Sequence, residues 1–218
     1  MIRSVNDTTR PQKVAERVTA YIDGFNLYYG LRAKGWRRYL WLDLFAFAES
    51  LVRPDQVLTG VTYCTARISG PPDSVRRQTT YLDALQVRGG IRIVEGKFLR
   101  KDDGRCKRCG NSWPVYEEKQ TDVNLAVEML RDAHLDMFDV AMLVSGDSDL
   151  APAVVAVREL HAAKRVVIAN PPARRSDVLA RSANGSFPIG RKKLADCQLA
   201  SSIVTRGGHQ LIRPPKWT

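Results

Sequence analysis

Four aspartates stand where apolar segments end or helical segments begin, and they are the residues of this chain best suited to catalysis. Asp23 follows the apolar run AYI, Asp147 and Asp149 follow the run AMLV, and Asp122 begins a helical pattern. In open α/β sheets, ligands bind in the crevice outside the carboxyl ends of the strands. We therefore expect the four carboxylates to face one crevice.

Carboxylates gathered in this way bind hard divalent cations. Mg²⁺ and Mn²⁺ take oxygen ligands, usually a few carboxylates together with waters and phosphate oxygens. Such an ion lowers the pKa of a bound water and neutralises charge on a phosphodiester, so no nucleophilic side chain is needed. The sequence thus predicts a metal-dependent phosphodiesterase site made of Asp23, Asp122, Asp147 and Asp149.

Each acid also has a structural explanation. A carboxylate at Asp122 favours a helix N-terminus, and Asp149 is placed to cap the helix that follows it. Asp23 precedes Gly24, and Asp-Gly pairs are common in turns. Capping accounts less well for two acids in the short segment SGDSD, since one cap does not require a second acid beside it. Their mutual repulsion favours a cation between them.

Three segments carry a family resemblance. YIDGFNLYYG, EKQTDVNLAVEML and LVSGDSDLAPAV resemble the signature blocks of the NYN domain family, which is related to the PIN-like nucleases. The resemblance runs from about Val18 to Asn170. It implies a PIN-like fold, an acidic Mg²⁺ or Mn²⁺ site and RNA as substrate. It also implies that the four acids bind the metal, and that Asn26 and Ser145 position substrate or the metal's waters.

The charge of the chain agrees with a polyanionic partner. Lys and Arg number 34 against 23 Asp and Glu, which gives a net charge of +11. Such a surface attracts nucleic acid before any specific contact forms, although a generally basic surface with no such role is the alternative. Six basic and two acidic residues fall in 97–108. The residues expected to contact RNA are Lys119, which lies close to Asp122, and Arg105, Lys107 and Arg108.

The pair Cys106 and Cys109 has the spacing of half a zinc site. No second pair with ligand spacing exists in the chain, so the favoured interpretation is free thiols in a substrate-facing loop, and a zinc ion shared across a homodimer is the alternative. Four cysteines do not form a disulfide framework.

No apolar run reaches the roughly 18 residues of a membrane span, and the first residues lack a signal-peptide core. We therefore expect a cytoplasmic protein without membrane association.

The elements that must position these residues follow a strand–helix rhythm. Strand-like runs at 18–23, 57–66, 91–99, 140–144 and 165–170 alternate with helical patterns, and residues 121–135 place Val123, Ala126, Val127 and Leu130 on one face. This rhythm predicts an α/β fold with a central, mostly parallel sheet and helices on both faces, the PIN-like or Rossmannoid arrangement. The predicted organisation is a flexible N-terminal arm (1–17), an NYN domain (18–172) with a basic CxxC loop (about 100–116), and a basic C-terminal extension packing on the domain (173–218).

The predicted function is hydrolysis of RNA phosphodiester bonds at an aspartate-bound Mg²⁺ or Mn²⁺ site. The alternative is a non-catalytic RNA-binding or regulatory protein with the same fold. A dehalogenase-type phosphatase needs a second aspartate where this chain has Phe25. A P-loop is excluded because the spacing from Gly90 to Gly96 is too long and Phe98 stands where Ser or Thr is required.

Overall fold

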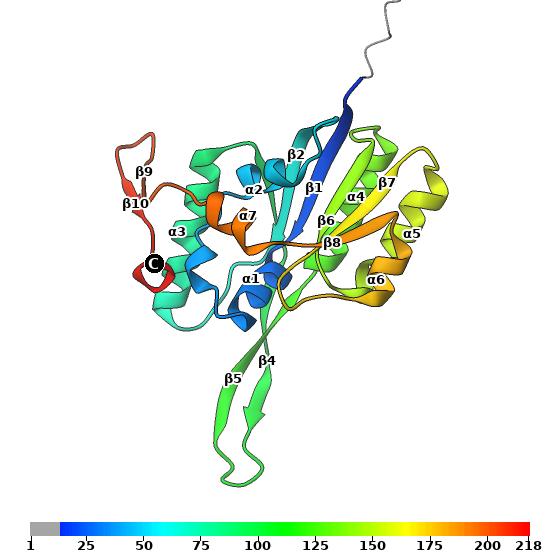
Figure 1. The fold of residues 1–218 in the computed structure, drawn as a ribbon. Coiled ribbons are helices and arrows are strands. Elements are labelled where there is room, and N and C mark those ends of the chain that lie inside the picture. The colour runs from blue at the N-terminus through cyan, green and yellow to red at the C-terminus, as the bar shows by residue number, and fades with distance from the viewer. Residues whose placement is uncertain (1–13) are drawn as a thin grey trace, which may run out of the picture.

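A six-stranded parallel sheet forms the centre of the computed structural model, which describes residues 14–218 (Figure 1). The strand order is β3-β2-β1-β6-β7-β8, and every neighbouring pair is parallel. The strands are β1 (Glu16–Asp23), β2 (Gln56–Thr65), β3 (Ile91–Glu95), β6 (Val140–Val144), β7 (Arg165–Asn170) and β8 (Gly185–Pro188). The order along the sheet reverses direction between β1 and β6, so their carboxyl ends border the position where α/β sheets bind ligands.

Helices cover both faces of the sheet, which confirms the predicted layers. Alternate side chains of β1 enter different cores: Ala20 and Ile22 pack in one, and Tyr21 packs in the other. The first core includes residues of α1 (Gly24–Ala33), α2 (Leu44–Leu51), α3 (Pro72–Arg88) and α7 (Arg191–Asp196). The second includes residues of α4 (Thr121–His134), α5 (Ala151–Leu160) and α6 (Asp177–Ser182).

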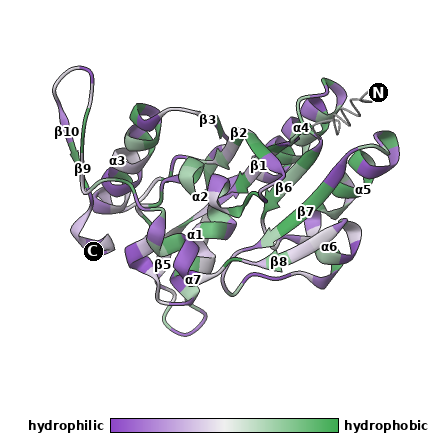
Figure 2. Ribbon diagram, turned by 45° about the horizontal axis from the view of Figure 1, so that its top comes forward, coloured by the Kyte–Doolittle hydropathy of each residue, from purple (hydrophilic) through white to green (hydrophobic). Residues whose placement is uncertain are grey.

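The apolar character of the central strands explains why this sheet forms. All five residues of β6 are buried, and Figure 2 shows the hydrophobic residues concentrated in the strands between the two helical layers. A parallel sheet buried on both faces needs such continuous apolar runs. Among the described residues, no helix is long and apolar enough to cross a membrane.

The segment predicted as a loop at about 100–116 is instead a two-stranded antiparallel hairpin. β4 (Lys97–Arg105) pairs with β5 (Ser112–Lys119), and the hairpin projects away from the sheet (Figure 1). The predicted strand 91–99 is divided at Gly96, where a Cβ atom would lie 2.6 Å from the carbonyl oxygen of Lys119. The chain therefore leaves the sheet at a residue that permits this close approach. The strands β4 and β5 were not predicted because their many charged side chains obscure the alternation of apolar and polar residues.

The ends of the predicted domain also differ from the structure. β1 begins at Glu16, before the predicted start at Val18, and the predicted arm from residue 1 to residue 13 lies outside the described residues. β8 pairs with β7, so residue 172 marks no break in the fold. Further along, β9 (Ser202–Val204), β10 (Gln210–Ile212) and the short helix η3 (Pro215–Trp217) follow. Trp217 is 7% exposed and belongs to the first core.

The buried face of α4 matches the predicted one only in part. Ala126 and Leu130 pack against the second core, but Val123 and Val127 are 63% and 55% exposed, and the buried positions include Leu125, Met129 and Asp132. Asp132 accepts a hydrogen bond from the Tyr21 hydroxyl (2.9 Å) and one from Arg92 (2.6 Å). The core stripe of this helix thus contains a carboxylate, which a purely hydrophobic pattern does not identify.

Candidate active site

The first turn of α4 and the carboxyl ends of β1 and β6 hold the four predicted acids. Asp23 ends β1 and is 3% exposed. Asp122 lies in the first turn of α4 and is half-buried. Asp147 and Asp149 follow β6, with Asp149 inside the short helix η2 (Ser148–Leu150). All four positions border the point where the strand order reverses.

Hydrogen bonds around Asp23 join the ends of β1 and β6. The backbone N–H of Asn26 donates to Asp23 Oδ1 (2.9 Å), and the Ser145 hydroxyl donates to Asp23 Oδ2 (2.9 Å). Asn26 in turn accepts the backbone N–H of Gly146 at its Oδ1 (3.0 Å). The backbone N–H of Asp147 donates to Ser145 Oγ (3.1 Å). Asn26 and Ser145 thus hold the aspartate segments in fixed relation to each other.

The carboxylates oppose each other's ionisation. Burial raises the pKa of Asp23 to about 7, against hydrogen bonds from Asn26 and Ser145 that lower it, and the charges of Asp122 and Glu118 raise it further. Burial also raises the pKa of Asp122 to about 6, with added repulsion from Asp147, Glu118 and Asp149. Acids that raise one another's pKa concentrate negative charge that a cation relieves.

Capping is distributed unevenly over the four acids. Asp23 caps α1, and Asp147 caps η2 by accepting the backbone N–H of Asp149 (3.0 Å). The N-cap of α4 is Gln120, and no hydrogen bond contributes to the pKa of Asp122. An ionised carboxylate has about four acceptor positions, so one capping bond leaves room for a metal. Asp122 is the acid whose position capping explains least.

The donor set fits a Mg²⁺ or Mn²⁺ ion by its chemistry. Within the described part of the chain, no three His, Cys, Asp or Glu side chains already surround a common metal position. Mg²⁺ is usually held by only one or two carboxylates, and waters and phosphate oxygens complete its shell. The oxygen-only donors and the mutual repulsion at Asp23 and Asp122 match that requirement.

Glu118 is a fifth acid of this cluster that the sequence interpretation missed. It lies on β5 and raises the pKa of both Asp23 and Asp122. Successive side chains of a strand point to opposite sides. Lys119, the next residue, instead pairs with Glu117 (3.1 Å), and its side chain is 52% exposed. The feature that could have identified Glu118 is its place in the block EKQTDVNLAVEML, a few residues before Asp122.

The structure does not bring the three arginine and lysine residues of the hairpin turn to the acids. Arg105 ends β4, and Lys107 and Arg108 lie in the turn that follows, all three exposed. The hairpin carries this turn away from the sheet (Figure 1). The same turn holds Cys106, whose pKa is lowered by hydrogen bonds from the backbone of Cys109 and Arg108.

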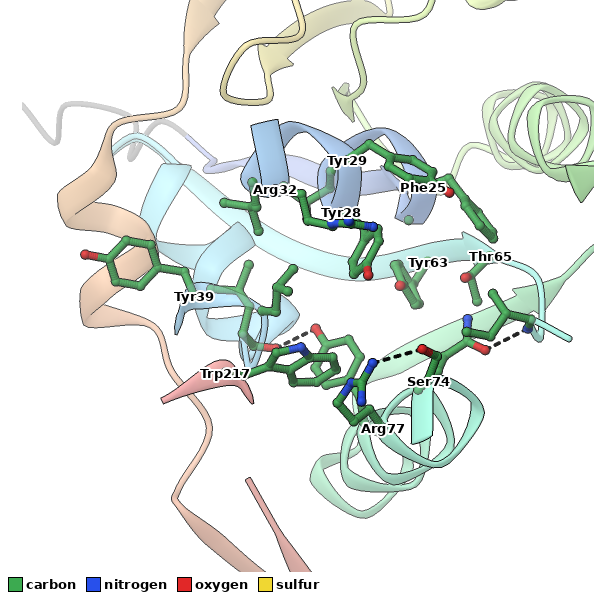
Figure 3. Close-up of a pocket in the computed structure, with 18 of the residues that line it drawn as sticks. Phe25, Tyr28, Tyr29, Arg32, Tyr39, Tyr63, Thr65, Ser74, Arg77 and Trp217 are labelled. Carbon is green, nitrogen blue, oxygen red and sulfur yellow. Dashed lines mark hydrogen bonds between the residues drawn. The ribbon is translucent and has the colours of Figure 1, made fainter. Parts of the chain in front are cut away.

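An aromatic cavity of about 270 Å³ lies beside the acid cluster. Its wall includes Gly24 and Phe25, which directly follow Asp23, but neither the four aspartates nor Glu118. Figure 3 shows Tyr28 and Tyr63 on one side of it and Arg77 and Ser74 of α3 on the other, with Trp217 beside Arg77. Burial raises the pKa of Tyr63 to about 12, so its hydroxyl stays protonated near neutral pH. The cavity therefore combines ring surfaces with two guanidinium groups, those of Arg32 and Arg77.

Comparison with known proteins identifies the family, one relative by sequence and one solved structure of similar fold. The NYN domain family matches residues 17–190. A 6-hydroxy-3-succinoylpyridine 3-monooxygenase from Pseudomonas putida (strain DSM 28022 / S16) is 31% identical over 245 aligned positions, which cover 92% of this chain and 75% of that protein. A crystal structure of a protein of unknown function from Vibrio parahaemolyticus RIMD 2210633 superposes with a TM-score of 0.55 at 20% identity. That match covers 87% of this chain and 100% of the Vibrio chain, and it supports the fold alone.

Proposed function

The chain belongs to the NYN domain family, a nuclease-like family, and on this premise we propose that it is a Mg²⁺- or Mn²⁺-dependent ribonuclease. The observation that carries the proposal is the convergence of Asp23, Asp122 and Glu118 at the edge of the sheet, where Glu118 raises the pKa of both aspartates and Asp122 raises that of Asp23. A charge concentration of this kind is costly unless it serves a cation. Phosphodiester hydrolysis is the chemistry that such a site performs without a nucleophilic side chain.

The residues of the proposed site divide into groups with different tasks. Asp122, Asp147 and Asp149 offer the accessible carboxylates, and Asp23 supplies the buried one. Ser145 and Asn26 hold the ends of β1 and β6 together through the hydrogen bonds they make with Asp23 and Gly146. The ion, when bound, activates a water and neutralises charge on the scissile phosphate. Glu118 adds negative charge next to Asp122, which strengthens attraction for a divalent cation.

RNA is the proposed substrate because the rest of the surface is basic. The net charge is +11 although the site itself is acidic, so the cations lie elsewhere on the molecule. Arg105, Lys107 and Arg108 on the projecting hairpin are proposed to contact the phosphate backbone at a distance from the acids. Lys119 is closer to the cluster, at the base of the hairpin, and is proposed to contact phosphates nearer to the cleaved bond.

The test is cleavage of end-labelled single-stranded and hairpin RNA by the purified protein with Mg²⁺, Mn²⁺ or EDTA. An Asp147→Asn variant should lose cleavage. An Asp196→Asn variant, which removes an exposed acid on α7, should cleave normally. Cleavage that survives EDTA or the Asp147 substitution contradicts the proposal. RNA binding without cleavage under every metal supports the non-catalytic RNA-binding alternative.

The aromatic cavity favours a second candidate function, action on a small aromatic acid. The Pseudomonas relative is named for a pyridine that bears a hydroxyl and a succinoyl group. A ring of that size suits a cavity walled by Tyr28, Tyr63 and Trp217, and Arg77 is placed to meet a carboxylate. Titration with 6-hydroxy-3-succinoylpyridine should change tryptophan fluorescence if this candidate is right. No saturable change, together with metal-dependent RNA cleavage, would eliminate it.

A further inference from the structure

The turn of the β4–β5 hairpin places two thiols at its outermost point. The backbone N–H of Cys106 donates to the carbonyl oxygen of Asn111 (2.8 Å), and that of Gly110 donates to the carbonyl oxygen of Cys106 (2.9 Å). Gly110 has a φ of 72°, a left-handed conformation that a side chain disfavours. The turn is therefore a closed loop of defined shape, with Cys106 and Cys109 on it.

The pKa of the Cys106 thiol is lowered by hydrogen bonds from the backbone N–H groups of Cys109 and Arg108 and from the Cys109 side chain. Amide donors directed at a sulfur stabilise its thiolate, and outer hydrogen bonds of this kind orient and tune metal ligands. Two adjacent thiols on one turn, one of them already accepting two amide bonds, form a preorganised half of a tetrahedral thiolate site.

One chain does not complete this site. A structural zinc ion takes four ligands, and within the described residues no third Cys, His, Asp or Glu joins the pair. Cys64 and Cys197 are buried inside the protein. With no further ligand beside the pair in the described part of the chain, a second copy of this chain is a source of the other two, because it offers an identical pair.

We propose that two copies of this chain join through a zinc ion held by Cys106 and Cys109 of each hairpin turn. The hairpin makes such a contact sterically accessible, because it projects beyond the helices that flank the sheet (Figure 1). Its strands have nine and eight residues, which corresponds to roughly 25–30 Å at the usual rise of a strand. Two turns can meet at one ion while the two sheets remain apart.

The charges at the turn make this association depend on the metal. Each turn carries Arg105, Lys107 and Arg108, so two bare turns repel each other. A zinc ion with four thiolates has a net charge of −2, which attracts the surrounding cations from both copies. The proposal thus assigns the hairpin cations a role at the dimer contact, independent of whether the acid cluster cleaves RNA.

The test uses the full-length protein purified without added chelator. We expect one zinc per two chains by elemental analysis and a dimer by light scattering, which a strong chelator converts to monomers. Replacing zinc with Co²⁺ should give the intense visible bands of a tetrahedral thiolate site. Cys106→Ser and Cys109→Ser should each yield zinc-free monomers, whereas the matched control Ser112→Ala, at an exposed position of the same hairpin, should keep metal and dimer.

Three results would overturn the proposal. They are a zinc-free monomer as purified under reducing conditions, one zinc per monomeric chain, and a dimer that persists in Cys106→Ser. Loss of folding is separated from loss of zinc by circular dichroism, which should be unchanged in both cysteine variants because the turn lies outside both hydrophobic cores. RNA cleavage is not a readout here, so failure of this test leaves the proposed nuclease function untouched.

Discussion

Replacing Asp122 with Asn should stabilise the metal-free protein and remove its response to metal. The Asp122 pKa is raised from its ordinary value of 3.8 to about 6, chiefly by burial and by the charge of Asp147. A carboxyl whose pKa is higher in the folded state than in the unfolded state stabilises the fold below its unfolded pKa. That stability is lost as pH rises through the folded pKa, here between about pH 4 and 6.

The size of the effect follows from the shift. A shift of about two pKa units corresponds to roughly 3 kcal/mol if unscreened. Because Asp122 is only half-buried, solvent screening reduces this figure to about 1 kcal/mol. Asn cannot ionise, so at pH 7.5 in EDTA the variant should be more stable by about 1 kcal/mol. The corresponding rise in Tm is about 2–4 °C for a chain of this size.

Bound metal should make the wild-type protein more stable than Asp122→Asn, the reverse of their order in EDTA. A ligand that binds only the folded state stabilises it by about 2.7 kcal/mol at a concentration one hundred times its Kd. Wild-type protein should therefore gain several degrees in Tm with Mn²⁺, while Asp122→Asn should gain little. Differential scanning fluorimetry across pH 5 to 8, with Mn²⁺ or EDTA, measures both effects. A variant that is less stable than wild type in EDTA, or equally responsive to Mn²⁺, would refute the assignment of Asp122 as an ionised metal ligand.

Three further substitutions test other contacts of the structure. Ser145→Ala removes the hydroxyl that donates to Asp23, so it should destabilise the protein by about 1–2 kcal/mol in urea titrations and move the half-point of the Mn²⁺ response to higher pH. Asp132→Ala removes the hydrogen-bond partner of the buried Tyr21 hydroxyl, so it should lower the free energy of unfolding by about 3–5 kcal/mol. The control Asp177→Ala breaks an exposed ion pair and should lower the free energy of unfolding by less than about 1 kcal/mol. Trp217→Ala should lower the free energy of unfolding by about 3–5 kcal/mol, because the side chain is buried in the core. A decrease below about 1 kcal/mol would show that the C-terminal segment does not stabilise the core.

The sequence predicted five of the six strands of the sheet, all but β8, because these strands follow short-range apolar patterns. β6 is a continuous apolar run followed at once by polar residues, so its end was readable without tertiary information. The same holds for β1 and Asp23. The NYN resemblance then linked segments that are distant in the chain, and the match to residues 17–190 confirms it.

The missed features all depend on contacts that a linear pattern does not contain. The hairpin strands are rich in charge, and a register shift between Lys101 and Gly104 interrupts their alternation. Glu118 follows no apolar strand, so the rule that identified Asp23 and Asp147 did not apply to it. On α4, Thr121 and Asp132 are buried and Val123 is exposed, because the helix packs through a polar network as well as through apolar contacts.

The measurement that tests the central claim most directly is the rate of RNA cleavage as a function of Mn²⁺ concentration, set beside the Mn²⁺-induced rise in Tm of the same protein. If the acid cluster is the catalytic metal site, cleavage should appear over the concentration range in which Tm rises. Both responses should disappear together in Asp122→Asn. A protein whose Tm response to Mn²⁺ is saturated but which leaves RNA intact would contradict the account.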